Sequence, residues 1–364
     1  MAFFCFKSLL GRCAKVAGLG GAIAVAVALM VAPAAHAEPI RGAGSTLAAP
    51  IVARWAAAYK NARADGGDFF TLDWTVDYEP VGSLAGLMRL NQPDLDFAAT
   101  DVPVPPAELA KNGQKQFPIV MGGIAVVANL DSLPEGELRL SGPVLADIFL
   151  GKIKSWSDPA IKALNPDIAL PDLAISVVHR QDGSGSTYVF TQFLSSSSEE
   201  WKTKLGTDTL IKWPLGAGAE GTQALLRAVT ATKGAIAYAE YGQVLRAGLR
   251  FAAVRNKSGK FVRPDQEGVQ AAAMSIAWSD TTDFFASLTD RDAEAAYPIS
   301  TAVFAVIQVS GRSADRYGRV HDLFRLAFAQ QGAGAAAALG YVPLPKTLVD
   351  QIEQYWAKQM PVGN

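Results

Sequence analysis

The sequence predicts an α/β protein with two domains. Its 364 residues exceed the usual length of one domain, which is about 100 to 200 residues. Half of the residues are hydrophobic and 18% are charged, a composition that excludes a disordered chain, a fibrous repeat and a small disulfide-held scaffold. Short apolar runs typical of strands alternate with amphipathic stretches typical of helices, and this order favours mainly parallel sheets.

The N-terminal segment has the order of a secretory signal peptide. Lys7, Arg12 and Lys15 supply positive charge, residues 16–32 form an uncharged run, and residues 35–37 (Ala-His-Ala) offer a small-x-small cleavage site. A transmembrane anchor is the disfavoured alternative, because the run is at the short end for a span and is rich in Ala and Gly.

Cleavage after Ala37 would leave residues 38–364, which contain no cysteine and can form no disulfide. Cys13 is not expected to carry a lipid, because the apolar run follows it rather than preceding it. No second long apolar run occurs, so we expect a free protein outside the cytoplasm. The formal net charge is −1, from 33 Lys and Arg against 34 Asp and Glu, so no basic excess predicts a nucleic-acid partner.

Strands and helices are expected to alternate along this chain. The expected strands are residues 73–78, 119–129, 175–179, 234–238 and 301–309. The expected helices are residues 47–60, 223–232, 280–287, 316–331 and 346–358. In the first helix Leu47, Ile51, Trp55 and Tyr59 recur every four residues. The four serines at 195–198 are interpreted as a loop that ends in a helix N-cap.

Glycine-serine segments precede helical stretches at three places. The first loop is residues 42–46 (Gly-Ala-Gly-Ser-Thr), the second is residues 81–84 (Val-Gly-Ser-Leu) and the third is residues 182–187 (Asp-Gly-Ser-Gly-Ser-Thr). A helix N-terminus carries unpaired N–H groups and partial positive charge, glycine permits close approach, and Ser and Thr add neutral donors. One such loop is weak evidence, but three together predict an anion site.

Tighter catalytic and nucleotide motifs are missing from the sequence. Residues 42–47 lack the third glycine of a dinucleotide fingerprint, and neither a Walker loop nor a G-x-S-x-G elbow occurs. His179 and His321 are the two histidines after residue 37, and a structural or surface role is expected for each. A serine hydrolase is therefore poorly supported.

Two charged residues lie close to the loops. Arg180 precedes the third loop and suits a bidentate contact with an oxyanion, although an ion pair with Asp182 is an equal alternative. Asp101 ends the run 95–101. A carboxylate beside an anion suits an anion that carries a proton, as phosphate does near neutral pH and sulfate does not, so Asp101 would select between them.

On these residues the chain resembles the periplasmic phosphate-binding proteins of phosphate ABC importers, the PstS family. The loop segments that match are residues 42–47, 82–83, 96–101 and 180–185. Further matching segments, in the same order along nearly all of the chain after the signal peptide, are residues 117–118, 150–153, 212–214 and 234–238.

The resemblance implies a two-lobed periplasmic binding protein fold, with two hinged α/β lobes and the ligand cleft between them. The first lobe is expected to comprise residues 38–121 and 301–364, and the second residues 122–300. The chain would cross between them at residues 122–123 and return near residues 300–304.

The resemblance also implies a function without catalysis. The protein would capture inorganic phosphate in the periplasm and deliver it to the membrane permease of an ABC importer. It is expected to be a monomer, with no cofactor, no metal and no nucleic-acid partner.

The same resemblance implies a set of ligand residues. They are Thr46, Leu47 through its backbone N–H, Ser83, Asp101 as acceptor of the phosphate proton, Arg180, Ser184, Gly185 and Ser186, with Asp182 orienting Arg180. The chain departs from the family at four positions. Leu47 replaces Phe, Ser186 replaces Thr, and Leu84 and Ala85 replace small polar residues, a change that bears on the shape of the second loop.

Three alternatives remain open. The ligand could be sulfate or arsenate; Asp101 argues against sulfate, and nothing in the sequence separates arsenate from phosphate. A phosphoester hydrolase outside the cytoplasm would need a metal cluster or a nucleophile–base pair, and the sequence offers neither. A related protein could sense or scavenge phosphate without serving an importer, which the site chemistry does not distinguish from transport.

Overall fold

The computed structural model describes residues 39–64, 75–131 and 137–361. The expected signal peptide lies outside these residues, as do the first two residues of the strand expected at 73–78. Within the described ranges, no helix has both the length and the apolar character needed to cross a membrane.

The strands form a nine-stranded mixed sheet and a small three-stranded sheet. The large sheet has the order β2-β1-β3-β12-β4-β8-β6-β7, and β9 pairs with β4. Its strands are β1 (Ile40–Gly44), β2 (Val76–Glu79), β3 (Phe97–Thr100), β4 (Gln114–Ala128), β6 (Ser176–Arg180), β7 (Ala217–Ala219), β8 (Ala235–Glu240), β9 (Arg250–Phe251) and β12 (Ser300–Gln308). The small sheet has the order β11-β10-β5 and comprises β5 (Arg139–Leu140), β10 (Ala253–Arg255) and β11 (Phe261–Val262).

The long strand β4 joins two halves of the large sheet. It pairs with β12 from Gln114 to Gly123 and with β8 from Ile124 to Ala128. We call β2, β1, β3, β12 and the paired part of β4 the first half, and the rest of β4 with β8, β6 and β7 the second half. The change of partner falls where the sequence predicts the first crossing between lobes.

Parallel pairing is confined to the flanks of the large sheet. β1 runs parallel to β2 and β3, and β6 runs parallel to β7 and β8. β12 is antiparallel to both β3 and β4, and β4 is antiparallel to β8. The expectation of mainly parallel sheets is therefore wrong at the centre, because the late strand β12 inserts between two early strands.

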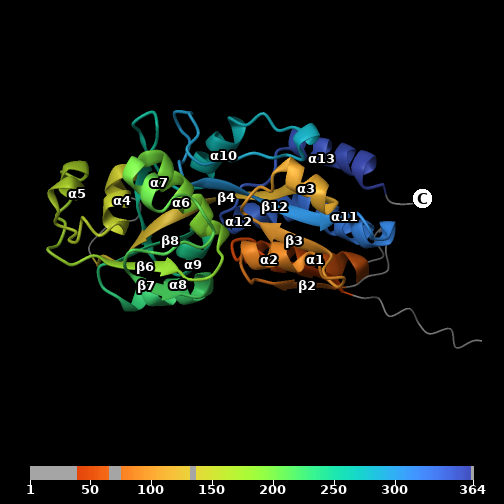
Figure 1. Cartoon of the computed structure of the whole chain (residues 1–364), viewed down its shortest axis with the longest axis horizontal. Coiled ribbons are helices and arrows are strands. Elements are labelled where there is room, and N and C mark those ends of the chain that lie inside the picture. The colour runs from red at the N-terminus through yellow and green to blue at the C-terminus, as the bar shows by residue number, and fades with distance from the viewer. Residues whose placement is uncertain (1–38, 65–74, 132–136, 362–364) are drawn as a thin grey trace, which may run out of the picture. The chain divides into compact units, whose positions relative to one another are not determined.

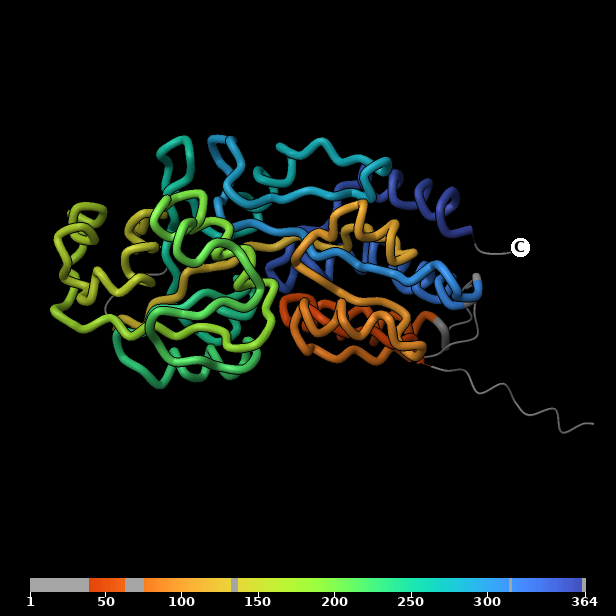
Figure 2. The backbone as a smooth tube through the Cα atoms, viewed as in Figure 1, coloured from red at the N-terminus to blue at the C-terminus, as the bar shows by residue number. Residues whose placement is uncertain are grey.

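Helices surround each half of the sheet. They are α1 (Ala49–Ala64), α2 (Ser83–Arg89), α3 (Pro106–Asn112), α4 (Gly142–Phe149), α5 (Pro159–Leu164), α6 (Gly185–Ser197), α7 (Glu199–Lys204), α8 (Gly221–Ala231), α9 (Tyr241–Arg246), α10 (Gln266–Met274), α11 (Ala314–Phe328), α12 (Gln330–Ala338) and α13 (Lys346–Gln359). Figure 1 shows α1, α2, α3, α11 and α13 around the first half, and α4, α6, α7, α8 and α9 around the second. The tube in Figure 2 shows the chain passing from orange to green between the halves and returning in blue.

Most expected helices are present with shifted ends. The face predicted for the first helix is confirmed, since Leu47, Ile51, Trp55 and Tyr59 are all buried in the core. The stretch expected at 316–331 is divided into α11 and α12 at Ala329, whose extended backbone ends the first helix.

Two local expectations need correction. The helix expected at 280–287 is a single 3₁₀ turn (Asp280–Thr282), because Asp283 and Phe284 adopt left-handed φ angles of 49° and 55°. The carboxylate of Asp283 is held by Lys115 and Tyr355, contacts far along the chain that override local helix propensity. In the serine run, α6 continues through Ser197, and only Ser198 is an N-cap, accepting from the Trp201 N–H of α7 (3.2 Å).

Candidate functional site

The three glycine-serine loops meet in the structure. The first loop ends β1 and leads into α1, the second leads into α2, and the third follows β6 and leads into α6. The Gly82 N–H donates to the Gly44 carbonyl (2.8 Å), and the Leu84 N–H donates to the Gly183 carbonyl (3.3 Å). The first two loops belong to the first half of the sheet and the third to the second half, so the loops join the halves at this point.

Two of the loop glycines are required by this close approach. Gly82 has a φ of +90°, and a Cβ there would lie 2.6 Å from the Gly183 carbonyl oxygen. A Cβ at Gly185 would lie 2.3 Å from Oδ2 of Asp101 and 2.4 Å from Oγ of Ser83. The backbone of Gly185, at the start of α6, is therefore packed directly against two side chains of the first half.

Asp101 lies just beyond the end of β3 and is 2% exposed. Its Oδ1 accepts a 2.5 Å hydrogen bond from the Ser45 hydroxyl, and its N–H donates to Oγ of Ser83 (3.2 Å). Burial raises the pKa of the Asp101 carboxyl to about 6, against the lowering effects of the Ser45 hydrogen bond and the charge of Arg180. This carboxyl can therefore accept a proton or a hydrogen bond near neutral pH.

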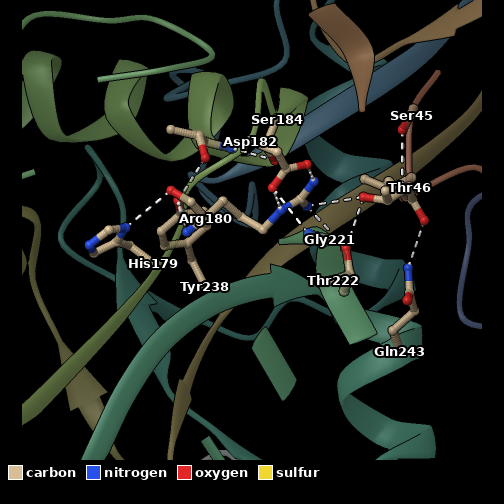
Figure 3. A network of polar contacts seen from close by, with 12 residues as sticks. Ser45, Thr46, His179, Arg180, Asp182, Ser184, Gly221, Thr222, Tyr238 and Gln243 are labelled. Atoms are coloured by element: carbon tan, nitrogen blue, oxygen red, sulfur yellow. Dashed lines mark hydrogen bonds and ion pairs between the residues drawn. The ribbon is translucent and has the colours of Figure 1, made fainter. Parts of the chain in front are cut away.

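Arg180 is the last residue of β6 and is also 2% exposed. Its Nε donates to Oδ1 of Asp182 (2.6 Å) and its Nη2 to Oδ2 of the same carboxylate. Its Nη1 donates to the hydroxyls of Thr46 (3.1 Å) and Thr222 (3.2 Å) (Figure 3). The sequence left two roles open for Arg180, an ion pair with Asp182 and a place beside the anion-binding loops. The structure contains both, so they are not alternatives.

Asp182 anchors this arginine to the start of α8. Its Oδ1 also accepts from the Gly221 N–H (3.1 Å). Burial acts to raise the pKa of Asp182, but the hydrogen bond and charge of Arg180, with the Gly221 N–H, outweigh burial and hold the pKa below its usual value. Asp182 is therefore an ionised partner that fixes the plane of the guanidinium.

The N-terminus of α6 forms the third side of the cluster. Ser184 is its N-cap and accepts from the Thr187 N–H (3.3 Å), while its own N–H donates to the Thr209 carbonyl (2.9 Å). Ser184, Gly185 and Ser186 are buried. The first turn of this 13-residue helix adds partial positive charge next to Asp101 and Ser83.

The first loop holds Thr46 and Leu47 in different roles. The Thr46 hydroxyl contacts Arg180, as described above, and its carbonyl accepts from Nε2 of Gln243 (3.0 Å). The Leu47 N–H donates to Oγ of Ser45 (3.1 Å), and the Leu47 side chain is buried in the core. The N–H expected to serve a ligand is thus satisfied here by the same serine that contacts Asp101.

Leu84, which departs from the family pattern, contacts the third loop. A Cβ at Gly183 would lie 2.6 Å from the Cβ of Leu84, so the two backbones are nearly in contact. The Leu84 side chain remains 37% exposed. Leu84 therefore adds an apolar contact between the halves beside the polar cluster.

Sequence reasoning missed three members of this cluster: Ser45, Thr222 and Gln243. Ser45 lies in the first loop directly before Thr46 and Leu47, the two residues of that loop that the resemblance implies as ligands. Thr222 follows Gly221 at the start of α8, so it repeats the glycine–hydroxyl pattern of the other loops. The helix expected at 223–232 begins two residues too late to include this pair. No sequence signal marks Gln243, which lies 197 positions from its partner Thr46.

Neither histidine ring faces the loops. The His179 ring stacks on Trp213 at 4.9 Å and its Nδ1 lies 3.1 Å from the backbone carbonyl of Arg180, on the side away from Thr46 (Figure 3). His321 lies in α11 and stacks on Trp356 at 4.6 Å. These contacts confirm the structural roles expected for both residues. Within the described ranges, no group of three or more His, Cys, Asp or Glu side chains could hold a metal ion.

The charges of the cluster restrict what it can bind. Arg180 is neutralised by Asp182, so the remaining full charge is that of Asp101 when ionised. Helix N-termini and hydroxyls favour an anion, but an ionised carboxylate repels one unless a proton lies between them. The arrangement therefore suits a small oxyanion that carries a proton.

This fold and this cluster define a class of substrate-binding proteins. The family model described as the PBP superfamily domain matches residues 31–318. Within that class, the chain belongs to the PstS family. It is 39% identical over 320 residues to the phosphate-binding protein PstS of Xylella fastidiosa, covering 88% of this chain and 85% of that one. It is 38% identical over 325 residues to the phosphate-binding protein PstS of Pasteurella multocida, covering 89% and 92%.

Solved structures share the fold at lower identity. The phosphate-binding protein of Stenotrophomonas maltophilia superposes with a TM-score of 0.64 at 20% identity, covering 87% of this chain and 94% of that one. A putative phosphate ABC transporter substrate-binding protein from Clostridium perfringens gives a TM-score of 0.61 at 18% identity, covering 85% and 100%. The family and the two-lobed α/β fold expected from the sequence are thereby confirmed.

Proposed function

We propose that this chain is a solute-binding protein that captures inorganic phosphate outside the cytoplasm and delivers it to an ABC importer, without catalysing a reaction. The observation that carries the proposal is Asp101, a buried proton acceptor in a cluster that otherwise favours an anion. The relatives named phosphate-binding protein PstS support the same ligand.

The proposed ligand residues are those of the three loops and their charged neighbours. Phosphate would accept from Ser83, Arg180 and the hydroxyl of Thr46, and from Ser184, Gly185 and Ser186 at the start of α6. The Leu47 N–H would donate to phosphate in place of Oγ of Ser45, to which it donates in the structure. Asp101 would accept the hydrogen bond of the phosphate proton, and Asp182 would hold Arg180 in place. The burial of Leu47, Ser83, Asp101, Arg180, Ser184, Gly185 and Ser186 and the contact of Arg180 with Thr46 support this assignment.

The two lobes are proposed to close on the ligand about a hinge. The first would comprise residues 38–121 and 301–364 and the second residues 122–300, with a crossing inside β4. The return crossing would be broader than one point. Asp283 contacts Lys115 of the first half, whereas Ser287 donates to Gln192 of α6 in the second (2.9 Å).

Delivery implies a location and a partner. We propose that the N-terminal segment is a signal peptide cleaved after Ala37, that the protein is a periplasmic monomer, and that its partner is the membrane permease of the importer. A scavenging or sensing role would use the same site. Deletion of the gene separates these roles, because only a transport protein is needed for phosphate uptake at low external phosphate.

Calorimetric titration of the ligand-free protein, purified from the periplasm, tests the ligand. Phosphate should bind at least about a hundredfold more tightly than sulfate, since sulfate would leave the Asp101 carboxylate facing an unprotonated anion. Arsenate carries a proton in the same pH range and should bind like phosphate. Equal affinities for phosphate and sulfate would contradict the role of Asp101.

A further inference from the structure

We propose that Thr222 is a positioning residue: its hydroxyl proton is donated to Oγ1 of Thr46, which leaves the proton of Thr46 to be donated to the bound anion. The inference rests on the proposed phosphate binding and assigns a role to a residue outside the expected ligand set.

The geometry is a triangle of three polar groups. Oγ1 of Thr222 lies 2.9 Å from Oγ1 of Thr46, and both oxygens accept from Nη1 of Arg180. Thr222 is 5% exposed and is the second residue of α8, whereas Thr46 lies in the first loop on the other half of the sheet. Figure 3 shows these two hydroxyls facing each other beside the guanidinium.

A bound anion sets the direction of the bond between the hydroxyls. A guanidinium only donates, so Arg180 supplies protons to both oxygens and accepts none. In the ligand-free protein either hydroxyl can donate to the other, since both have the same described partners. An anion that contacts Thr46 accepts from its hydroxyl, and the Thr222 hydroxyl then donates to Thr46, the one described partner that can accept from it.

This arrangement makes Thr46 a stronger donor. Its oxygen accepts from a cation and from a hydroxyl at the same time, and such polarised chains strengthen the next hydrogen bond. Gln243 fixes the Thr46 carbonyl, and Asp182 ties Arg180 to Gly221, the residue before Thr222. The three groups of the triangle are therefore held in register before an anion arrives.

The test compares Thr222→Val with Thr222→Ser by titration with inorganic phosphate. Val keeps the volume and removes the hydroxyl, and it should weaken phosphate affinity about tenfold, the equivalent of one net hydrogen bond. Ser keeps the hydroxyl and should stay within about twofold of the unchanged protein. Thr230→Val, on the same helix with its hydroxyl bonded to the Leu226 carbonyl, is the matched control and should leave affinity unchanged.

A double-mutant cycle separates positioning from a merely structural role. In a Thr46→Val background, Thr222→Val should weaken binding by less than about twofold, because its effect acts through the hydroxyl that is already gone. The inference is overturned if Thr222→Val binds as well as the unchanged protein, or if it loses about tenfold in both backgrounds. Should Val prevent folding, Thr222→Ala is compared with Thr222→Ser in the same cycle. Failure of the unchanged protein to bind phosphate would refute the proposed function instead.

Discussion

The Ser45 hydroxyl donates to Oδ1 of Asp101 across 2.5 Å, inside a site where that carboxyl is almost fully buried. The bond joins the first loop to the end of β3 and opposes the effect of burial on the pKa of Asp101. One hydroxyl thus tunes the group that we propose meets the phosphate proton.

The pH dependence of stability follows from this carboxyl. Its folded-state pKa of about 6 lies above its usual value of 3.8, so its contribution to stability is present below about pH 4 and lost as pH rises through about 6. Over a pH range that extends beyond both values, the free energy of unfolding of the ligand-free protein should fall by about 3 kcal/mol relative to that of Asp101→Asn, measured by urea unfolding. If the free energies of unfolding of the two proteins changed in the same way with pH, the pKa of Asp101 would not be raised by folding.

Replacing Arg180 should abolish tight binding while the fold persists. Arg180→Ala removes the only described cation in contact with the Thr46 and Thr222 hydroxyls, and we expect phosphate affinity to fall about a hundredfold. Arg316→Ala is the matched control, because Arg316 makes a similar two-nitrogen contact with Asp96 away from the loops. The control should lose stability but bind phosphate as before. If Arg180→Ala bound phosphate with unchanged affinity, the role of Arg180 would be only the structural ion pair with Asp182.

A methyl group at Gly185 should separate the two halves. The added Cβ would overlap Asp101 and Ser83, at 2.3 and 2.4 Å, so Gly185→Ala should weaken phosphate binding more than about tenfold. Gly334 lies within α12, and no heavy atom comes within 4 Å of the place that an added Cβ would take. Gly334→Ala should therefore raise stability by about 0.5 to 1 kcal/mol and leave binding intact. Equal binding by both variants would mean that Gly185 is not at the ligand.

Removal of the Leu84 side chain tests its contact between the halves. Leu84→Ala takes away apolar packing against the third loop and should speed phosphate dissociation about threefold to fivefold, as followed by stopped-flow fluorescence. Met88→Ala lies one turn along α2 and is 69% exposed, so its dissociation rate should not change. If phosphate dissociated at the same rate from both variants, Leu84 would be a surface residue that does not stabilise the contact between the halves.

Local patterns predicted the parts of the site that lie within one short segment. The three loops and the pair Arg180 and Asp182 follow from neighbouring residues, whose chemistry is readable before folding. The bond of Thr46 to Thr222 spans 176 positions, so no local pattern contains it. The same reason explains the antiparallel centre of the sheet and the missing helix after Asp280, where distant partners of Asp283 outweigh local propensity.

The insertion of β12 between β3 and β4 has a consequence for the timing of folding. The first half of the sheet lacks the strand that joins β3 to β4 until residues 300–308 have been made, which is late in synthesis. Pairings of such long sequence separation form slowly. A nascent chain of this topology therefore stays without the β3–β12 and β12–β4 pairings while most of it emerges from the ribosome, and the sheet can be completed only when translation is nearly finished.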